Sequence, residues 1–299
     1  MLRRAVIISA ALLASSAMIG APPGSAAAGS NWSGYLHGPR HSSDASDSVA
    51  ITASNAAGLR AAWTFTPTAK TGTTNTFNAS PVTYNGIVYI GAGTGDFYAV
   101  DEATGQVRWR KVLAPNSGCN SRGIISTATV AADPVSGART VYVAAADHYL
   151  YALDPSTGAT RWRSLVGGTT SFFNWASPTV VGGKIYQVVS SDCGVFTNRA
   201  GVAKYDQHTG AKLAAYTTAP GQTSGIPNVY TSALADGTGN VYVTTGDGAH
   251  GDSMSLVRLR DSDLSRRVAG CCRTGRQLGL QRQPGVLHRS CGHDGRGLQ

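Results

Sequence analysis

Asp101-Glu-Ala-Thr-Gly105 is the first of three copies of one phrase in this chain, and the others are Asp154-Pro-Ser-Thr-Gly158 and Asp206-Gln-His-Thr-Gly210. An aromatic residue follows each copy: Trp109, Trp162 and Tyr216. From Trp109 to Trp162 is 53 residues, and from Gly158 to Gly210 is 52. A period in this range, with several short strands in each unit, indicates the blades of a β-propeller.

Each repeat reads as four short strands. In the first unit these are a Ser-Pro-Val segment at 80–82, Ile87–Ile90, Phe97–Val100 and Val107–Arg110, with glycines at the breaks between them. A fourth unit starts at Thr231-Ser232, includes Val241-Tyr-Val243 and reaches Asp261 before the pattern ends. The sequence therefore predicts an all-β fold, an incomplete β-propeller of about four four-stranded antiparallel blades.

The phrase Asp-x-x-Thr-Gly-x-x-x-Trp after Tyr-Ala-Leu-Asp resembles the repeat of the pyrroloquinoline-quinone (PQQ) propellers, a superfamily that contains quinoprotein alcohol dehydrogenases and non-enzymatic propellers. The resemblance covers about residues 31–265, and 63–265 are expected to form the repeats after an irregular lead-in segment at 29–62. It implies the fold, because the repeat residues pack blades in enzymes and non-enzymes alike. Four aromatic residues are expected to pack between blades: Trp63, Trp109, Trp162 and Tyr216.

Residues 1–28 have the pattern of a secretory signal peptide. Arg3-Arg4 supply the positive start, residues 5–20 the apolar stretch, and the small residues at 25–28 a cleavage site. The apolar run is short for a membrane span and has no second basic flank. We therefore expect a secreted protein without a membrane span.

The last part of the chain, residues 266–299, has a different composition: 7 Arg and 7 Gly, but no Lys, Ile, Phe, Tyr or Trp. A disordered basic tail is one interpretation. The other is an out-of-frame segment, because a one-base shift across Arg276–Arg289 can give a string containing FNASPV, which occurs in frame at Phe77–Val82. On either interpretation this segment is predicted not to pack on the propeller.

The formal net charge of +9 comes mainly from the two ends of the chain. Residues 266–299 carry 7 Arg against Asp294 alone, and Arg3-Arg4 belong to the predicted signal peptide. Since the predicted propeller is close to neutral, the chain is not expected to bind nucleic acid.

Cysteines divide in the same way. Cys271, Cys272 and Cys291 lie in the last segment, whereas Cys119 and Cys193 lie in loop-like insertions of neighbouring repeats. In an exported protein the last two are predicted to form a disulfide.

The resemblance also sets expectations about cofactors. PQQ dehydrogenases carry a vicinal disulfide beside the quinone, a Ca²⁺ held by acidic and amide side chains, and an Asp as base. Cys271-Cys272 follows the fourth repeat, and Cys119 is followed by Asn120, so neither position reproduces the vicinal pair. Asp247 and Asp252 are weak candidates for a metal site, because acids flanked by glycine are usually turn residues. As written, the chain is expected to bind no cofactor and to have no catalytic residue.

Other motifs point to structure rather than chemistry. Gly91-Ala-Gly-Thr-Gly95 resembles a dinucleotide loop, but a strand follows it and not a helix. His148 and His208 lie in or beside turns and are interpreted as surface residues, and no Cys-x-x-Cys-His motif for attached haem is present.

Two functions remain open from the sequence. The favoured one is a secreted, monomeric, non-catalytic propeller that binds a protein or polymer through the insertions after Leu113 and Ser190. The alternative is an inactive fragment of a PQQ-dependent dehydrogenase, for which PQQ and Ca²⁺ would be the cofactors. Blades and calcium ligands in the shifted downstream frame would favour the dehydrogenase.

Overall fold

The structure, a computed structural model of the chain, describes residues 31–46, 50–71, 73, 75–113, 123–167, 172–191, 200–224, 226–246 and 248–271. The predicted signal peptide, Cys119, Cys193, Asp247 and everything after Cys271 lie outside these residues. The described chain contains strands and two short 3₁₀ turns, η1 (Tyr35–His37) and η2 (Ala56–Gly58).

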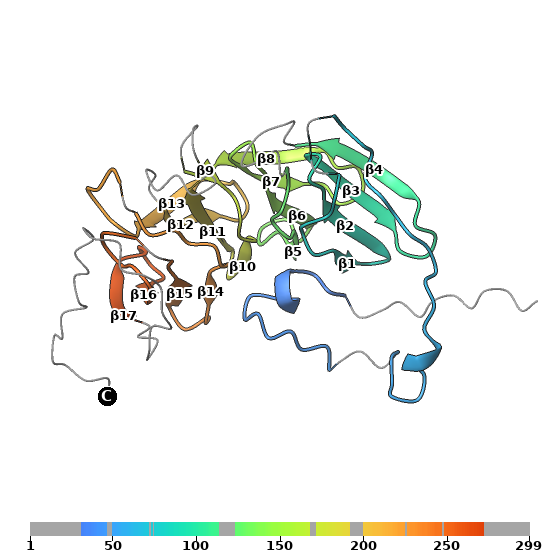
Figure 1. Cartoon of the computed structure of the whole chain (residues 1–299), viewed down its shortest axis with the longest axis horizontal. Helices are drawn as coiled ribbons and strands as arrows, with labels where there is room; N and C mark the ends of the chain where they lie inside the picture. The colour runs from blue at the N-terminus through green and yellow to red at the C-terminus, as the bar shows by residue number, and fades with distance from the viewer. Residues whose placement is uncertain are drawn as a thin grey trace, which may run out of the picture.

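Four antiparallel sheets lie side by side in chain order along an arc (Figure 1). The first blade contains β1 (Val82–Tyr84), β2 (Ile87–Gly91), β3 (Asp96–Asp101) and β4 (Val107–Val112). The second contains β5 (Thr129–Ala132), β6 (Arg139–Ala144), β7 (Tyr149–Leu153) and β8 (Thr160–Leu165). The third contains β10 (Thr179–Val181), β11 (Lys184–Ser191), β12 (Gly201–Asp206) and β13 (Lys212–Thr217), and β9 (Phe172–Phe173) pairs with β11. The fourth contains β14 (Leu234–Ala235), β15 (Asn240–Thr244), β16 (Ser255–Arg260) and β17 (Arg266–Cys271). The prediction of four four-stranded blades is confirmed.

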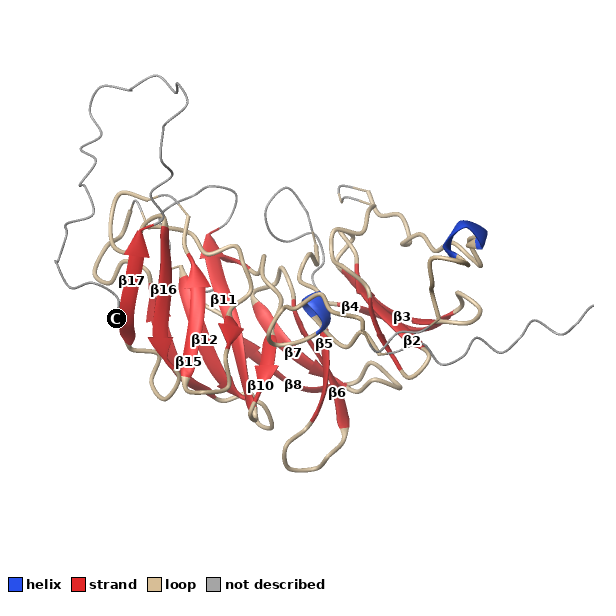
Figure 2. Cartoon of the chain, turned by 90° about the horizontal axis from the view of Figure 1, so that it is seen from below, coloured by secondary structure: helices blue, strands red, loops and turns tan. Residues whose placement is uncertain are grey.

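The first strand of each blade contacts the first strand of the next, so β1, β5, β10 and β14 form an inner row (Figure 1). Apart from the two 3₁₀ turns, the described chain consists of strands and loops (Figure 2). Hydroxyl groups just before these inner strands join the blades. The backbone N–H of Ser80 donates to Thr127 Oγ1 at 3.0 Å, that of Thr127 to Ser177 Oγ at 3.0 Å, and that of Ser177 to Ser232 Oγ at 2.9 Å. This chain of bonds explains the hydroxyl residues that begin the second, third and fourth units.

The repeated phrase joins blades at their outer side. Asp101 Oδ1 accepts bonds from the backbone N–H and the hydroxyl of Thr104, which closes the turn, and Gly105 adopts a φ of 71°. A Cβ on Gly105 would lie 2.7 Å from the ring of Trp63, so only glycine lets the indole lie on this turn. The indole N–H of Trp63 also donates to the Glu102 carbonyl at 2.8 Å.

The next two junctions repeat this arrangement. The Trp109 ring lies 2.7 Å from the Cβ position of Gly158, and its N–H donates to the Pro155 carbonyl at 2.8 Å. The Trp162 ring lies 2.6 Å from the Cβ position of Gly210. Each tryptophan therefore belongs to one blade and covers the glycine turn of the following blade, as predicted for Trp63, Trp109 and Trp162.

The fourth junction differs from the sequence alignment. By strand register, the residue equivalent to Trp109 and Trp162 is Ala214, and Tyr216 lies two positions later. Tyr216 does pack between blades, but it does so by donating its hydroxyl to Asp252 Oδ2 at 2.5 Å. Buried Leu264, with a φ of 57°, takes the glycine position of the turn. The large residue is therefore in the turn and the small one, Ala214, in the strand, which reverses the order of the earlier junctions.

A lysine supplies the missing donor at this junction. Lys204 lies opposite Ala214, where the other blades have Ala99 and Ala152 opposite tryptophan. The buried Lys204 ammonium donates to the carbonyls of Asp261 and Ser262. Asp261 is the second residue of its turn, as Glu102 and Pro155 are of theirs, so the ammonium replaces the indole N–H.

The structure corrects the predicted boundary at residue 265. Residues 266–271 form β17, which pairs with β16 from Leu259↔Arg266 to Ser255↔Cys271. Arg266 also forms an ion pair with Asp252 at 2.9 Å. Strand pairing needs only backbone groups, so the Arg- and Gly-rich composition that suggested a tail did not prevent it. The prediction that 266–299 stay apart from the propeller is wrong for residues 266–271.

Residues 60–66 lie where a preceding blade would have its outer strand. Trp63 and Phe65 pack on Tyr98 and Val100, and exposed residues alternate with them along the segment. The described residues provide no neighbouring strand for this segment. The arc therefore begins with a segment that packs on the first blade in the position of a blade's outer strand.

Candidate functional site

The two ends of the blades differ in their chemistry. We call the end with the Asp-x-x-x-Gly turns the turn end, and the end with the β2–β3 hairpin and its equivalents the connection end. Three aspartates of the connection hairpins, Asp96, Asp147 and Asp252, each accept a hydrogen bond from a tyrosine hydroxyl. The connection end therefore carries a row of buried or half-buried carboxyl groups.

Asp96 is a closed ion cluster. Burial alone would raise the pKa of its carboxyl, but hydrogen bonds from Lys70, Thr94 and Arg110 lower it below 3.8. Lys70 Nζ lies 2.9 Å from Oδ1, and Arg110 Nη2 lies 3.0 Å from Oδ2. The carboxylate is fully buried and both oxygens are occupied, so its role is to fix the loop before β1 on the first blade.

The pKa of Asp147 shifts in the opposite direction to that of Asp96. Burial raises the pKa of its carboxyl, and the hydrogen bond donated by Tyr151 does not offset this. Burial and the neighbouring Asp147 also raise the pKa of Tyr151 to about 12. Next to this pair, the buried Nδ1 of His148 has no partner among the described residues, and the Arg163 guanidinium lies 4.6 Å from the Tyr149 ring centroid. A carboxyl with a raised pKa beside an unpaired imidazole nitrogen is a candidate for proton transfer.

Side chains from the next blade extend this group. Asn174 Nδ2 donates to the Ala145 carbonyl at 2.9 Å, which ties the segment before β10 to the Asp147 hairpin. Trp175 is half-buried and packs edge-to-face on Tyr230 at 5.9 Å, while Asn228 donates to the Tyr230 hydroxyl at 2.8 Å. We take Asp147, His148, Arg163, Trp175 and Tyr230 as the candidate site. It offers aromatic surface, one cation, a carboxyl group and an imidazole.

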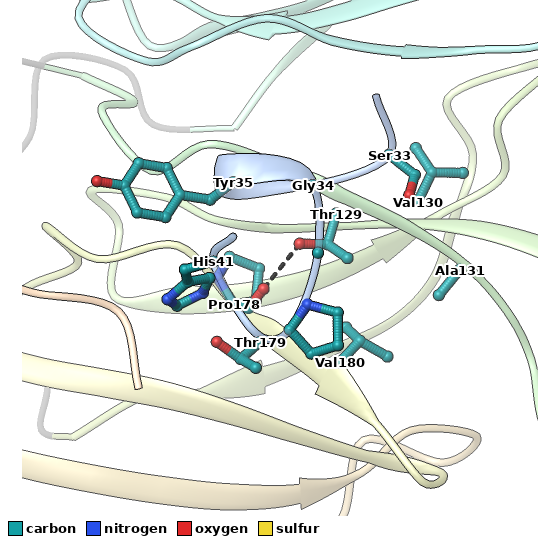
Figure 3. A pocket seen from close by; sticks show the side chains of 12 residues that line it. Ser33, Gly34, Tyr35, His41, Thr129, Val130, Ala131, Pro178, Thr179 and Val180 are labelled. Atoms are coloured by element: carbon teal, nitrogen blue, oxygen red, sulfur yellow. Dashed lines mark hydrogen bonds between the residues drawn. The ribbon is translucent and has the colours of Figure 1, made fainter. Parts of the chain in front are cut away.

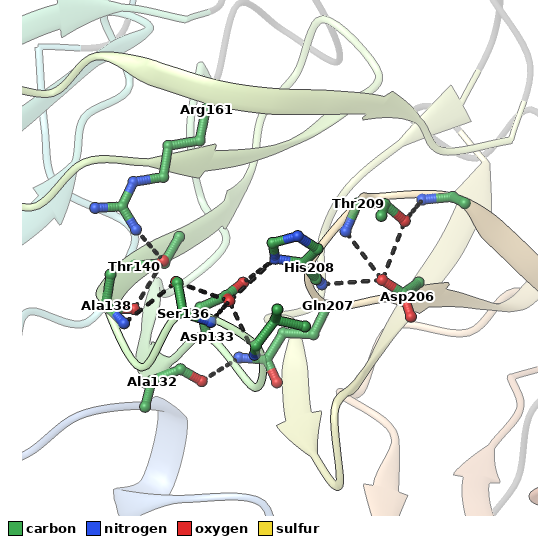
Figure 4. A network of polar contacts seen from close by, with 12 residues as sticks. Ala132, Asp133, Ser136, Ala138, Thr140, Arg161, Asp206, Gln207, His208 and Thr209 are labelled. Atoms are coloured by element: carbon green, nitrogen blue, oxygen red, sulfur yellow. Dashed lines mark hydrogen bonds and ion pairs between the residues drawn. The ribbon is translucent and has the colours of Figure 1, made fainter.

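The turn end carries a separate polar network (Figure 4). His208 Nδ1 lies 3.0 Å from both oxygens of Asp133, and Gln207 Nε2 donates to the Ala132 carbonyl at 2.7 Å. Asp133 is buried, and the bonds from its own turn and from His208 lower its pKa despite that burial. The interpretation of His208 as a simple surface residue is thus incomplete: it joins the third blade to the second.

Neither of the two predicted metal candidates, Asp247 and Asp252, is part of a described metal site. Asp247 lies outside the described residues. Asp252 accepts from Tyr216 and pairs with Arg266, and a guanidinium there disfavours a cation. No group of three or more His, Cys, Asp or Glu able to hold a metal occurs within the described ranges. The disulfide between Cys119 and Cys193 stays a prediction, since both lie outside those ranges.

Comparison with known proteins identifies the family. The family model "PQQ: Glucose/ethanol/alcohol dehydrogenase, beta-propeller domain" matches residues 31–252. The chain belongs to this PQQ propeller family. The match covers the three Trp–Gly junctions and the candidate site.

Relatives share this family. The chain is 29% identical over 180 residues to quinohemoprotein alcohol dehydrogenase ADH IIB of Pseudomonas putida, an alignment that covers 57% of this chain and 24% of that protein. Quinohemoprotein alcohol dehydrogenase from Comamonas testosteroni has a similar structure, with a TM-score of 0.63, 21% identity, and coverage of 81% of this chain and 41% of that one. A europium-containing methanol dehydrogenase gives a TM-score of 0.55 at 18% identity, covering 74% of this chain and 45% of the other. The chain thus spans less than half of each of these relatives.

The described residues fit the cofactors of such proteins only in part. Trp175 and Tyr230 offer aromatic surface for a planar quinone, and Arg163 offers a cation for a carboxylate. A divalent cation needs several converging oxygens, whereas Asp96 and Asp252 are held by Lys or Arg and Asp147 accepts the Tyr151 hydroxyl. The donor set in the described part of the chain therefore does not fit a calcium-type site.

Sequence reasoning missed the Asp147 site. Asp147 lies in Ala145-Ala-Asp-His148, a hairpin with no distinctive motif, and its partners Asn174, Trp175 and Tyr230 come from two other repeats. The signal available in the sequence was the position of Asp147. It lies in the β6–β7 hairpin, which is equivalent to the β2–β3 hairpin next to Asp96. Within the described residues no helix is long and apolar enough to cross a bilayer.

Proposed function

We propose that this chain is part of the propeller of an alcohol-oxidising quinoprotein, and that by itself it is a binding module without dehydrogenase activity. The family match over residues 31–252 carries the first half. The second half rests on the carboxyl groups at the connection end, which already pair with Lys, Arg or Tyr side chains. The signal-peptide pattern supports export of the chain, which we include in the proposal.

A cofactor titration tests the second half. The full chain, expressed without its first 28 residues, is titrated with PQQ in the presence of Ca²⁺ while tryptophan fluorescence is followed, and alcohol oxidation is measured with an artificial dye. We expect no dye-linked oxidation. Saturable quinone binding together with turnover of alcohol would overturn this half of the proposal.

An extended chain tests the first half. The extended variant continues from about residue 271 with the sequence encoded downstream in the shifted reading frame. We expect further blades, PQQ binding and dye-linked oxidation from it, whereas the original chain stays inactive. Blades without PQQ binding would contradict the dehydrogenase and favour the second candidate.

The second candidate is a secreted, monomeric, non-catalytic propeller that binds a protein or polymer through the insertions after Leu113 and Ser190. One observation favours it: ion pairs at Asp96 and Asp252 serve packing and not chemistry. Under this candidate the extended chain should form a soluble monomer that binds no quinone.

A further inference from the structure

A small cavity lies at the inner row of strands, away from the candidate site. Its volume is about 120 Å³, and it lies, partly open to solvent, where residues 33–41 cross β5 and β10 (Figure 3). The residues that matter below are Tyr35, His41, Thr129, Ala131, Thr179 and Val180. Neither the family match nor the repeat pattern accounts for this cavity.

The wall formed by residues 31–41 is held in place. The Val130 N–H donates to the Ser33 carbonyl at 2.7 Å, and the Thr83 N–H donates to the Trp32 carbonyl at 3.0 Å. The segment therefore lies across the inner strands of two blades. His41 has a φ of 50°, a conformation that costs a non-glycine residue energy and persists only when its surroundings hold it. The cavity is thus a feature of a fixed segment.

The cavity contains unpaired hydrogen-bonding groups but no charge. Burial lowers the pKa of His41, so its imidazole is neutral at pH 7 and offers one donor and one acceptor nitrogen. Within the described residues these nitrogens have no hydrogen-bond partner; the ring only packs on Tyr35 at 5.4 Å. Thr129 and Thr179 donate their protons to the carbonyls of Pro178 and Ala233, which leaves their oxygens able to accept.

Size and polarity restrict what can enter. An apolar protein cavity of about 150 Å³ holds benzene, so this cavity holds about five non-hydrogen atoms. Its remaining wall is apolar, with Val130, Ala131 and Val180. A charged ligand would lose its hydration without gaining an opposite charge, whereas a hydroxyl group can pair with His41 while its alkyl part contacts the valines.

We propose that this cavity is a binding site for a small uncharged hydroxyl compound, such as an alcohol of two to four carbons, with His41 as its hydrogen-bond partner. The site is independent of the proposed function, because it lies at the inner strands and involves none of the residues of the candidate site. Affinity is limited by the small number of ligand atoms and is expected in the millimolar range.

The test is an NMR titration of the full chain with 1-propanol, with the rings of His and Tyr isotopically labelled. We expect saturable shifts of the His41 and Tyr35 ring signals. The variant His41→Phe keeps the ring contact with Tyr35. Its apparent affinity for 1-propanol, measured from the Tyr35 ring signals, should be at least tenfold lower. His250→Phe changes an exposed histidine and should bind as the unmodified chain does.

Two further arms keep the test decisive if His41→Phe does not fold. Ala131→Val narrows the cavity without removing a polar group. It should weaken the binding of 1-propanol but leave the binding of methanol unchanged. Propionate, similar in size but charged, should not bind. Shifts that spread over all histidines without saturation, unchanged binding in Ala131→Val, or equal binding of propionate would each overturn the proposal.

Discussion

At the residue scale, three of the junctions between blades are formed by one tryptophan that packs on one glycine. The indole covers a turn whose glycine has a positive φ, and its N–H closes the bond to that turn's second carbonyl. Because the contact needs both an aromatic plane and the absence of a Cβ, each partner explains the other. The repeated phrase in the sequence therefore records a contact between blades and not only a turn.

Substitution of Trp109 tests this contact. Trp109→Ala should lower the free energy of unfolding by about 3 kcal/mol, since it removes a large side chain and leaves the Pro155 carbonyl with only the longer bond from the Tyr89 hydroxyl. Urea unfolding followed by circular dichroism gives the value. The matched control is Val107→Ala in the same strand, where the side chain is 44% exposed and the change should stay within about 0.5 kcal/mol. Equal losses in the two variants would show that the tryptophan is not special.

The Asp96 cluster predicts a dependence on pH. Its folded-state pKa is lowered, so the stability that it contributes is present above 3.8 and is lost as the pH falls through the folded value. Asp96→Asn should therefore cost about 2 kcal/mol at pH 7 and progressively less below pH 4. Thermal unfolding across pH 2.5–7 measures the difference between the two proteins. A difference that does not change with pH would mean that the charge is irrelevant.

At the scale of the element, the fourth junction keeps the same function with different residues. Lys204, Ala214 and Leu264 occupy the places of alanine, tryptophan and glycine in the earlier blades. The volume that the indole fills elsewhere is shared between a leucine of the next turn and a lysine of the neighbouring strand. A junction can thus be conserved in shape while its sequence signature disappears.

Restoring the repeat residues tests this equivalence. Ala214→Trp alone should destabilise the fold by about 1–3 kcal/mol, because Leu264 and Lys204 already fill the space. The triple variant Lys204→Ala, Ala214→Trp, Leu264→Gly should recover most of that loss, which a comparison of urea midpoints would show. If the triple variant is less stable than Ala214→Trp, the three positions do not form one unit.

The same junction shows what the sequence could predict. Three blades and their tryptophans follow from a phrase repeated in register, and the hydroxyl before each inner strand follows from the same alignment. Tyr216 was matched by its aromatic character, although the spacing of the phrase, four residues after the glycine, points to Ala214, and the strand register agrees with that spacing. The Asp147 site was missed because Asp147, Asn174 and Tyr230 come together only when three blades are stacked. β17 was missed because a segment with Arg266 and Gly270 does not have the sequence pattern of a strand, although its backbone pairs with β16.

At the scale of the molecule, each blade of the arc packs on the adjacent blades. The buried hydrophobic clusters lie between successive sheets, so each blade depends on the one before and the one after it. The fourth blade is complete in strands only because residues 266–271 belong to it.

Two truncations test the end of the fold. A chain that stops at Cys271 should unfold at nearly the same urea concentration as the full chain, whereas one that stops at Ser265 should be less stable and less soluble. The shorter variant loses β17 and the Arg266–Asp252 pair, and it exposes the edge of β16. Urea unfolding and light scattering at matched concentration give both quantities. Identical behaviour of the two truncated chains would argue against β17.

The tryptophan joint also gives the arc a direction. In each joint the indole comes from the earlier blade and the glycine turn from the later one, so the two faces of a blade are never interchangeable. A symmetric pair of copies related by a two-fold axis would set like faces against each other and could not form this joint. Self-association that reuses this joint must therefore run head to tail, and such contacts either close into rings or continue into filaments.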